Sequence, residues 1–231
     1  MGDSPSPKQA AGIAAAEHVK TGTILGLGTG STVAFFLDAL ALRMEKEGLE
    51  VIGVPTSVDT AEKCKELGIP LATLEEQPVL DLVVDGADEV DPEFRLIKGG
   101  GGALLREKIV AAAGTKVIII IGGGKRVERL GTTFLLPVEV LPFGYLSIRG
   151  RVAELGECKP YVRNTEAGEP FITDNGNYIL DCRFEKGIAD PVQLHAILSQ
   201  IPGVVEVGLF LDLCHLVIEG NDDGTAVTLQ R

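Results

Sequence analysis

Short apolar runs alternate with segments of helical periodicity over the first half of the chain. The apolar runs have the length of buried strands and lie at residues 23–27, 51–54, 79–84 and 116–121. The helical segments lie at 8–19, from a glycine-containing loop at 28–32 to about 44, at 58–67 and at 103–114. Alternation of this kind is typical of a parallel sheet covered on both faces. We therefore predict an α/β fold with a Rossmann-like parallel-sheet domain.

After about residue 131 the elements become shorter and their order changes. Strands are predicted at 137–141, 159–163, 177–183 and 203–207, with helices at 145–155 and 191–200. The second helix has Asp190 as its expected N-cap. The order strand-helix-strand-strand-helix-strand indicates a smaller α+β ferredoxin-like domain. The last apolar segments, 209–211 and 216–218, are expected to return to the first sheet.

These patterns predict two domains. A Rossmann-like catalytic domain would comprise residues 1–130 and 208–231, and a ferredoxin-like lid or assembly domain would comprise residues 131–207.

The loop Gly28-Thr29-Gly30-Ser31-Thr32 joins a predicted strand to the start of a helix. Unpaired N–H groups and the positive end of the helix dipole make such a loop a site for anions. The alternative is an ordinary turn in which Ser31 or Thr32 is the N-cap. The glycines and hydroxyls exceed what a cap needs, so we favour phosphate binding. The loop lacks the glycine at position 31 of a dinucleotide fingerprint and the Gly-Lys-Ser/Thr of a P-loop, which favours a small phosphate ester over a nucleotide.

The segment at residues 85–108, DGADEVDPEFRLIKGGGGALLREK, concentrates acidic, basic and glycine residues. Asp85 closes an apolar strand, and ligands of open α/β sheets bind beyond such strand ends, which places Asp85 and Asp88 at the candidate site. Lys98 precedes four glycines, Gly99 to Gly102. The N–H groups of a glycine loop can closely approach an anion or a developing oxyanion.

Glu107 follows in the predicted helix 103–114, whose apolar residues Leu105, Ile109 and Ala112 have helical spacing. It lies about 200° around the helix from Leu105, so we expect it to point away from the face that packs on the sheet. Alone, Arg106-Glu107-Lys108 would be interpreted as a solvated charged patch. The preceding glycine loop favours a functional glutamate.

A further lysine, Lys125, follows Gly122-Gly123-Gly124 at the end of the strand 116–121. It is either a solvated loop residue or an anion contact. All of these candidates follow strand ends, so we expect them at one edge of one sheet.

Composition narrows the classes of partner. The 231 residues are 45% hydrophobic and carry a formal net charge of −12, which argues against nucleic acid or an anionic membrane surface. The four cysteines are scattered and the three histidines lack metal-ligand spacing, so we expect buried free thiols and no metal. The N-terminus has no signal pattern and no apolar run could span a bilayer, so we expect a cytoplasmic protein.

A carboxylate, a lysine with glycine N–H groups and a separate phosphate anchor suit proton abstraction next to a carbonyl. An aldose–ketose isomerase needs this set, because one base moves a proton between C2 and C1 while cations stabilise the enediolate. No cofactor is required. A free glutamate has a pKa of about 4.3, so burial or a neighbouring Asp85 or Asp88 is expected to raise the pKa of the base.

Four motifs, in order along nearly the whole chain, resemble type A ribose-5-phosphate isomerase. They are Gly28-Thr29-Gly30-Ser31-Thr32, Asp85-Gly86-Ala87-Asp88-Glu89, Lys98-Gly99-Gly100-Gly101 with Arg106-Glu107-Lys108, and Thr173-Asp174-Asn175-Gly176-Asn177. The resemblance implies reversible conversion of ribose 5-phosphate to ribulose 5-phosphate in the pentose phosphate pathway, without a metal or other cofactor. It also implies a homodimer or homotetramer.

The resemblance implies a role for each matching residue. Glu107 would transfer the proton, Lys98 and the glycine amides would stabilise the enediolate, and Asp85 and Asp88 would bind sugar hydroxyls and help to open the furanose ring. The substrate-binding set would be Lys8, Thr29, Gly30, Ser31, Thr32, Asp85, Gly86, Ala87, Asp88, Lys98, Gly99, Gly100, Gly101 and Lys125. The glycines before Lys125 depart from the polar stretch usual in the family.

Two other functions fit part of the pattern. A coenzyme A transferase of related architecture would use the glutamate as a nucleophile that forms a thioester. A sugar-phosphate sensor would bind the same ligand without turnover, but no basic helix-turn-helix segment accompanies it here. A sensor also has no need of an aligned base and lysine, so we favour the isomerase.

Overall fold

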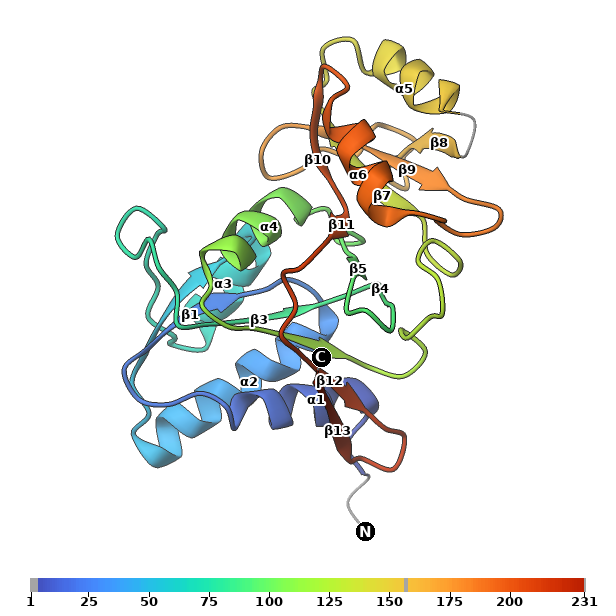
Figure 1. Ribbon diagram of the computed structural model, residues 1–231. Helices are drawn as coiled ribbons and strands as arrows, with labels where there is room; N and C mark the ends of the chain where they lie inside the picture. The colour runs from blue at the N-terminus through green and yellow to red at the C-terminus, as the bar shows by residue number, and fades with distance from the viewer. Residues whose placement is uncertain (1–3, 156–157, 231) are drawn as a thin grey trace. The chain divides into compact units, whose positions relative to one another are not determined.

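The computed structural model describes residues 4–155 and 158–230, which form two compact units (Figure 1). The first unit comprises Met1–Ala87, Arg106–Lys125 and Asp212–Arg231, and the second comprises Asp88–Leu105 and Arg126–Leu211. The sequence-based boundaries differ, because they assign residues 88–105, 126–130 and 208–211 to the first domain.

The first unit is built on a six-stranded sheet in the order β13-β12-β6-β3-β1-β2. Its parallel strands are β1 (Thr23–Leu27), β2 (Val51–Pro55), β3 (Leu82–Gly86), β6 (Val117–Ile121) and β12 (Leu216–Gly220). The predicted parallel sheet and the return of residues 216–218 to it are thus confirmed. The antiparallel edge strand β13 (Ala226–Gln230) was not predicted, because its largely exposed residues form no apolar run.

Helices cover both faces of this sheet. On one face α1 (Pro7–Ala16) and α2 (Ser31–Glu47) lie side by side, and their buried side chains share a core with alternate residues of the strands (Figure 1). Residues 106–113 of α4 (Leu104–Ala113) cover the other face, where a Cβ added at Gly26 would lie 2.6 Å from Val110. The helix α3 (Val58–Glu66) follows β2, and Ser57 caps it through the Thr60 N–H. No helix in the described part of the chain has the length and apolar character needed to cross a membrane.

The second unit contains the predicted order of six elements. They are β7 (Leu136–Val140), α5 (Tyr145–Glu154), β8 (Lys159–Val162), β9 (Tyr178–Arg183), α6 (Pro191–Ser199) and β10 (Val204–Val207). The strands form an antiparallel sheet in the order β10-β7-β9-β8. Asp190 caps α6 as predicted, accepting the Gln193 N–H at 3.0 Å. The ferredoxin-like arrangement inferred from the order of the elements is therefore present.

A small three-stranded sheet completes the second unit. It pairs β11 (Leu209–Phe210) with β5 (Leu96–Ile97), and β5 with β4 (Glu89–Val90). The expectation that residues 209–211 return to the first sheet is therefore wrong. Strands of two residues are too short for their side-chain pattern to specify a partner.

All four cysteines are buried and free, as predicted. Burial raises the pKa of the Cys64 thiol to about 11, so this thiol is protonated near neutral pH.

Candidate functional site

The Gly28–Thr32 loop follows β1 and leads directly into α2. The helix begins at Ser31, and its N-cap is Gly30 at φ 115°, a conformation that favours glycine. No side chain caps the helix, so Ser31 and Thr32 are its first residues rather than its cap. The structure thus removes the capping alternative, and the first turn of α2 presents N–H groups suited to an anion.

The Thr29 hydroxyl contacts a cluster of three further hydroxyl groups, which were not predicted from the sequence. Its Oγ1 lies 2.7 Å from Thr56 Oγ1, 2.8 Å from Ser57 Oγ and 3.2 Å from Thr60 Oγ1. Thr60 also donates a hydrogen bond to the Gly28 carbonyl at 2.8 Å. These residues follow β2, which pairs with β1. A run of hydroxyl residues after the neighbouring strand could therefore have indicated this cluster from the sequence.

Asp85 lies within β3 and is only 1% exposed. Its Oδ1 accepts the Thr29 N–H at 3.1 Å and the Gly86 N–H at 2.7 Å. A Cβ at position 28 would lie 2.1 Å from this oxygen, so the close approach requires Gly28. The structure therefore brings Asp85 and the Gly28–Thr32 loop together, as their places at neighbouring strand ends predicted.

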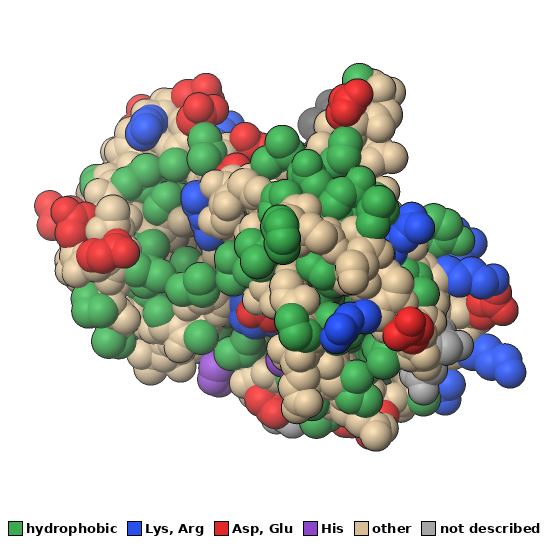
Figure 2. Space-filling view, turned by 90° about the horizontal axis from the view of Figure 1, so that it is seen from above, with side chains coloured by type: hydrophobic (Ala, Val, Ile, Leu, Met, Phe, Trp, Pro, Cys, Tyr) green, Lys and Arg blue, Asp and Glu red, His purple; other side chains and the backbone are tan. Residues whose placement is uncertain are grey.

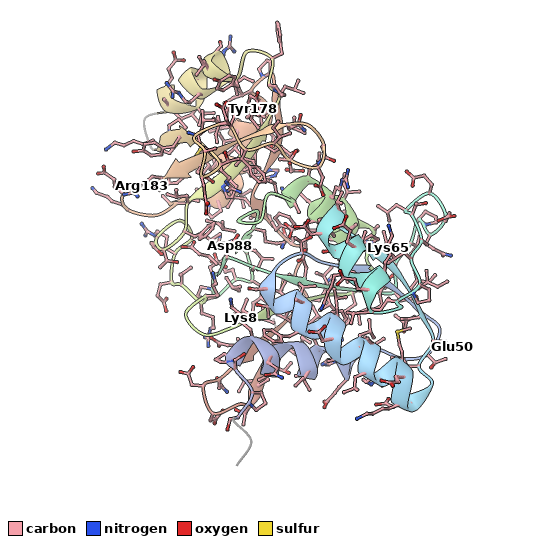
Figure 3. All side chains as sticks on the ribbon, turned by 180° about the vertical axis from the view of Figure 1, so that it is seen from behind. Lys8, Glu50, Lys65, Asp88, Tyr178 and Arg183 are labelled. Atoms are coloured by element: carbon pink, nitrogen blue, oxygen red, sulfur yellow. The ribbon has the colours of Figure 1, made fainter. Side chains whose placement is uncertain are left out.

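Lys8 joins this loop from the first turn of α1 (Figure 3). Its Nζ donates a hydrogen bond to Ser31 Oγ at 2.9 Å. A Cβ at position 122 would lie 3.1 Å from Lys8 Cγ, so Gly122, directly after β6, borders the same side chain. Lys125 ends that glycine loop and is half-buried. Only the resemblance to a family indicated Lys8; no local pattern did.

Glu107 lies in the first turn of α4 and is 5% exposed. The expected apolar face is wrong, because Ile109 is 49% exposed whereas Leu104 and Ala111 are buried on the same side as Glu107. Apolar residues surround most of this helix, so their spacing allowed two faces. The burial excludes a solvated charged patch as the explanation of Glu107.

Lys98 and the four glycines belong to the second unit, directly after β5 of its three-stranded sheet, so the expectation that all candidates lie at one edge of one sheet is wrong for them. Lys98 is 3% exposed, and its Nζ lies 5.4 Å from the centroid of the Phe210 ring. Its main-chain N–H donates to the Gly208 carbonyl at 2.9 Å. The position of this lysine is therefore set by both its main chain and its side chain.

Two N–H groups of the glycine loop are used within the second unit. Asp88 Oδ2 accepts the Gly100 N–H at 2.8 Å, and Gly99 O accepts the Gly102 N–H at 3.0 Å. Asp88 thus contacts the loop main chain as well as lying in the predicted sugar-binding motif. The N–H groups of Gly99 and Gly101 are left as the candidate oxyanion donors.

Glu89, the next acid of the same motif, has a structural role. It is completely buried, and its carboxylate accepts the N–H groups of Gly131 at 2.5 Å, Thr133 at 2.6 Å and Phe134 at 2.8 Å. These bonds anchor the segment before β7.

The sequence matches the family described as ribose 5-phosphate isomerase A (phosphoriboisomerase A) over residues 52–224. The chain belongs to this family. A relative from Synechococcus sp. (strain JA-3-3Ab), named ribose-5-phosphate isomerase A, is 52% identical over 225 residues, which cover 97% of each chain.

Solved structures of the ribose 5-phosphate isomerase A family have the same fold. The ribose 5-phosphate isomerase from Plasmodium falciparum is 38% identical over 97% of both chains, with a TM-score of 0.93. A D-ribose-5-phosphate isomerase in complex with phospho-erythronic acid is 36% identical over 97% of both chains, with a TM-score of 0.92. The predicted family and fold class are therefore confirmed.

Proposed function

We propose that this protein interconverts D-ribose 5-phosphate and D-ribulose 5-phosphate in the non-oxidative pentose phosphate pathway. The observation that carries this conclusion is its membership of the ribose 5-phosphate isomerase A family, with a relative 52% identical over nearly the full length. The protein is an aldose–ketose isomerase.

The reaction transfers the carbon-bound proton from C2 to C1 and needs no external oxidant. A base removes the C2 proton of the open-chain aldose, the electron pair forms a C1–C2 double bond, and negative charge develops on O1. The proton then returns to C1, the O2 proton moves to O1, and the carbonyl forms at C2. We propose Glu107 as this base, because it is a buried carboxylate at the start of a helix that follows the glycine loop.

Lys98 and two main-chain N–H groups are the proposed partners of the enediolate. The ammonium group of Lys98 supplies positive charge in a buried position. Gly99 and Gly101 supply the N–H groups, because those of Gly100 and Gly102 bind Asp88 and Gly99 O.

The phosphate end of the substrate is assigned to the start of α2. Gly30, Ser31 and Thr32 offer N–H and hydroxyl groups there, and Lys8 adds a cation through its 2.9 Å hydrogen bond to Ser31. Lys125 is proposed as a second cation at the same ligand group.

Asp85 and Asp88, with the main chain of Gly86 and Ala87, are assigned to the sugar hydroxyls and to ring opening. The two aspartates are three residues apart, so chain length alone keeps their Cα atoms within about 11 Å.

The activity is tested by adding ribose 5-phosphate to the purified protein in excess EDTA and measuring ribulose 5-phosphate. We expect turnover and competitive inhibition by phosphoerythronate, which carries a carboxylate where the enediolate charge develops. Binding of ribose 5-phosphate without turnover would instead indicate a sensor. Absence of binding, with acyl transfer from an acyl-CoA, would indicate the transferase.

We also propose that the protein is a homodimer or homotetramer. Many apolar side chains lie on the face seen in Figure 2, and the exposed large hydrophobic residues of the described chain include Phe143 and Leu146 at 93% and 56% exposure. Sedimentation equilibrium measures the state, and a monomer at micromolar concentration would contradict this proposal. A cytoplasmic location remains a prediction.

A further inference from the structure

The guanidinium group of Arg163 is held rigidly in the second unit, just after β8. Its Nε lies 2.9 Å from Asp181 Oδ2 and its Nη2 lies 2.5 Å from Asp181 Oδ1. The two side chains are only 15% and 17% exposed. Asp181 is in the middle of β9, paired across the sheet with Tyr161 and Pro137. A bidentate pair on a central strand fixes both the position and the orientation of the guanidinium plane.

The remaining nitrogen of Arg163 binds the glycine loop. Nη1 donates to the Gly99 carbonyl at 2.9 Å and to the Gly100 carbonyl at 3.0 Å, although these residues lie more than sixty positions away in the sequence. The same segment contacts the end of the loop, because a Cβ at Gly102 would lie 2.5 Å from the Phe171 ring, and the Phe171 N–H donates to Arg163 O at 2.8 Å.

These bonds fix the peptide planes of the loop. The peptide bonds here are trans, and in a trans peptide the N–H points opposite to the carbonyl. The peptide joining Gly99 to Gly100 is held at its carbonyl by Arg163 and at its N–H by Asp88. The next peptide has its carbonyl held by Arg163, so the Gly101 N–H is turned to the opposite side.

Glycine peptides need such an external restraint. Gly99 and Gly102 have φ values of 107° and 83°, and no side chain limits rotation about the glycine backbone. Without the two carbonyl contacts, the Gly101 N–H would sample several directions, and an oxyanion donor is effective only when it is preorganised.

We propose that Arg163 is a positioning residue for the enediolate-stabilising loop and that Asp181 holds Arg163 in place for this task. This inference rests on the proposed function, since it requires the Gly101 N–H to face the negative charge of the enediolate. Arg163 acts through the loop main chain and not by contact with the substrate.

The test compares Arg163→Gln with Arg183→Gln, which removes an exposed arginine from β9 of the same sheet (Figure 3). Kinetics with ribose 5-phosphate give kcat and KM, and calorimetry gives the Kd of two open-chain ligands. Phosphoerythronate carries a carboxylate at the position of the enediolate charge, whereas ribitol 5-phosphate is uncharged there. Arg163→Lys and Asp181→Asn are measured in parallel.

For Arg163→Gln we expect kcat to fall about 10- to 100-fold and the Kd of phosphoerythronate to rise by a similar factor. KM and the Kd of ribitol 5-phosphate should change less than about threefold, because phosphate and hydroxyl contacts are retained. Arg163→Lys should not restore kcat, because one ammonium cannot bind Asp181 in two places and still reach both carbonyls. Arg183→Gln should match the unmodified protein.

An unchanged ratio of the two Kd values in Arg163→Gln would overturn the inference, even if the variant melts at a lower temperature. If Arg163→Gln does not fold, the same ratio in Asp181→Asn and Arg163→Lys decides the question. The proposed function fails separately, when the unmodified protein does not isomerise ribose 5-phosphate. Turnover by the unmodified protein together with full kcat in the Arg163 variants would refute the inference alone.

Discussion

Two aspartates three residues apart bind different glycine-containing loops. Asp85 accepts the Thr29 N–H of the loop before α2, whereas Asp88 accepts the Gly100 N–H of the loop after Lys98. Each carboxylate therefore helps to set the conformation of the loop that it contacts.

The contact between Lys8 and Ser31 gives a prediction about phosphate binding. Ser31→Ala and Lys8→Met should each raise KM for ribose 5-phosphate about tenfold, the scale of one hydrogen bond to a charged group, with kcat within about twofold. Steady-state kinetics measure both constants. Lys65→Met, on the exposed surface of α3, is the control (Figure 3). A fall in kcat at unchanged KM would contradict the phosphate assignment.

Lys98 gives the opposite prediction. Lys98→Met keeps most of the side-chain volume and removes the charge, so kcat should fall about 10²- to 10³-fold while KM changes less than about threefold. The comparison with Lys65→Met separates this effect from a general change of net charge. If KM alone rises, Lys98 is a substrate anchor and not a partner of the enediolate.

Site residues whose neighbours in the sequence indicate their role could be predicted. Residues whose contacts are distant in the sequence could not. Asp85 and Lys98 were found because each adjoins a strand end or a glycine run in the sequence. The predicted orientation of Glu107 was wrong because apolar residues surround most of its helix, so their spacing allows two buried faces. Ile109, on the predicted buried face, is exposed, whereas Leu104 is buried. Arg163 was missed because its partners, Gly99 and Gly100, are joined to it only by the folded chain.

At the scale of elements, the close packing of α1 on α2 depends on one glycine. A Cβ at Gly12 would lie 2.6 Å from the Phe36 nitrogen and 2.8 Å from the Phe35 carbonyl carbon, both main-chain atoms. Main-chain atoms cannot move aside as a flexible side chain can. Gly12 therefore sets the distance between the helix that carries Lys8 and the helix that begins at Ser31.

A pair of glycine substitutions tests this packing. Gly12→Ala should lower the free energy of unfolding by about 1–3 kcal/mol through overpacking. Gly150→Ala is the matched control, because Gly150 lies inside α5 with nothing within 4 Å of an added Cβ. Alanine in a helix interior should raise the free energy of unfolding there by about 0.5–1 kcal/mol. Urea unfolding measures both, and equal stability of the two variants would contradict the packing argument.

At the scale of the whole molecule, the sequence predicted the architecture of both domains, but its boundaries between them differ from those of the two compact units. Alternating strands and helices specified the parallel sheet, and the order of the later elements specified the ferredoxin-like sheet. The boundary differed because Leu96–Ile97 pairs with Leu209–Phe210, a contact between two short segments more than a hundred residues apart. Such pairing leaves no periodic signal in either segment.

The central claim is that this isomerase uses Glu107 to move the proton between C2 and C1. The most direct measurement is the rate of ribulose 5-phosphate formation by Glu107→Gln in excess EDTA, beside Glu62→Gln on the exposed side of α3. We expect kcat of Glu107→Gln to fall about 10²- to 10⁴-fold with little change in KM, because the amide cannot accept the proton. Glu62→Gln should retain full activity. An unchanged kcat in Glu107→Gln would contradict the account.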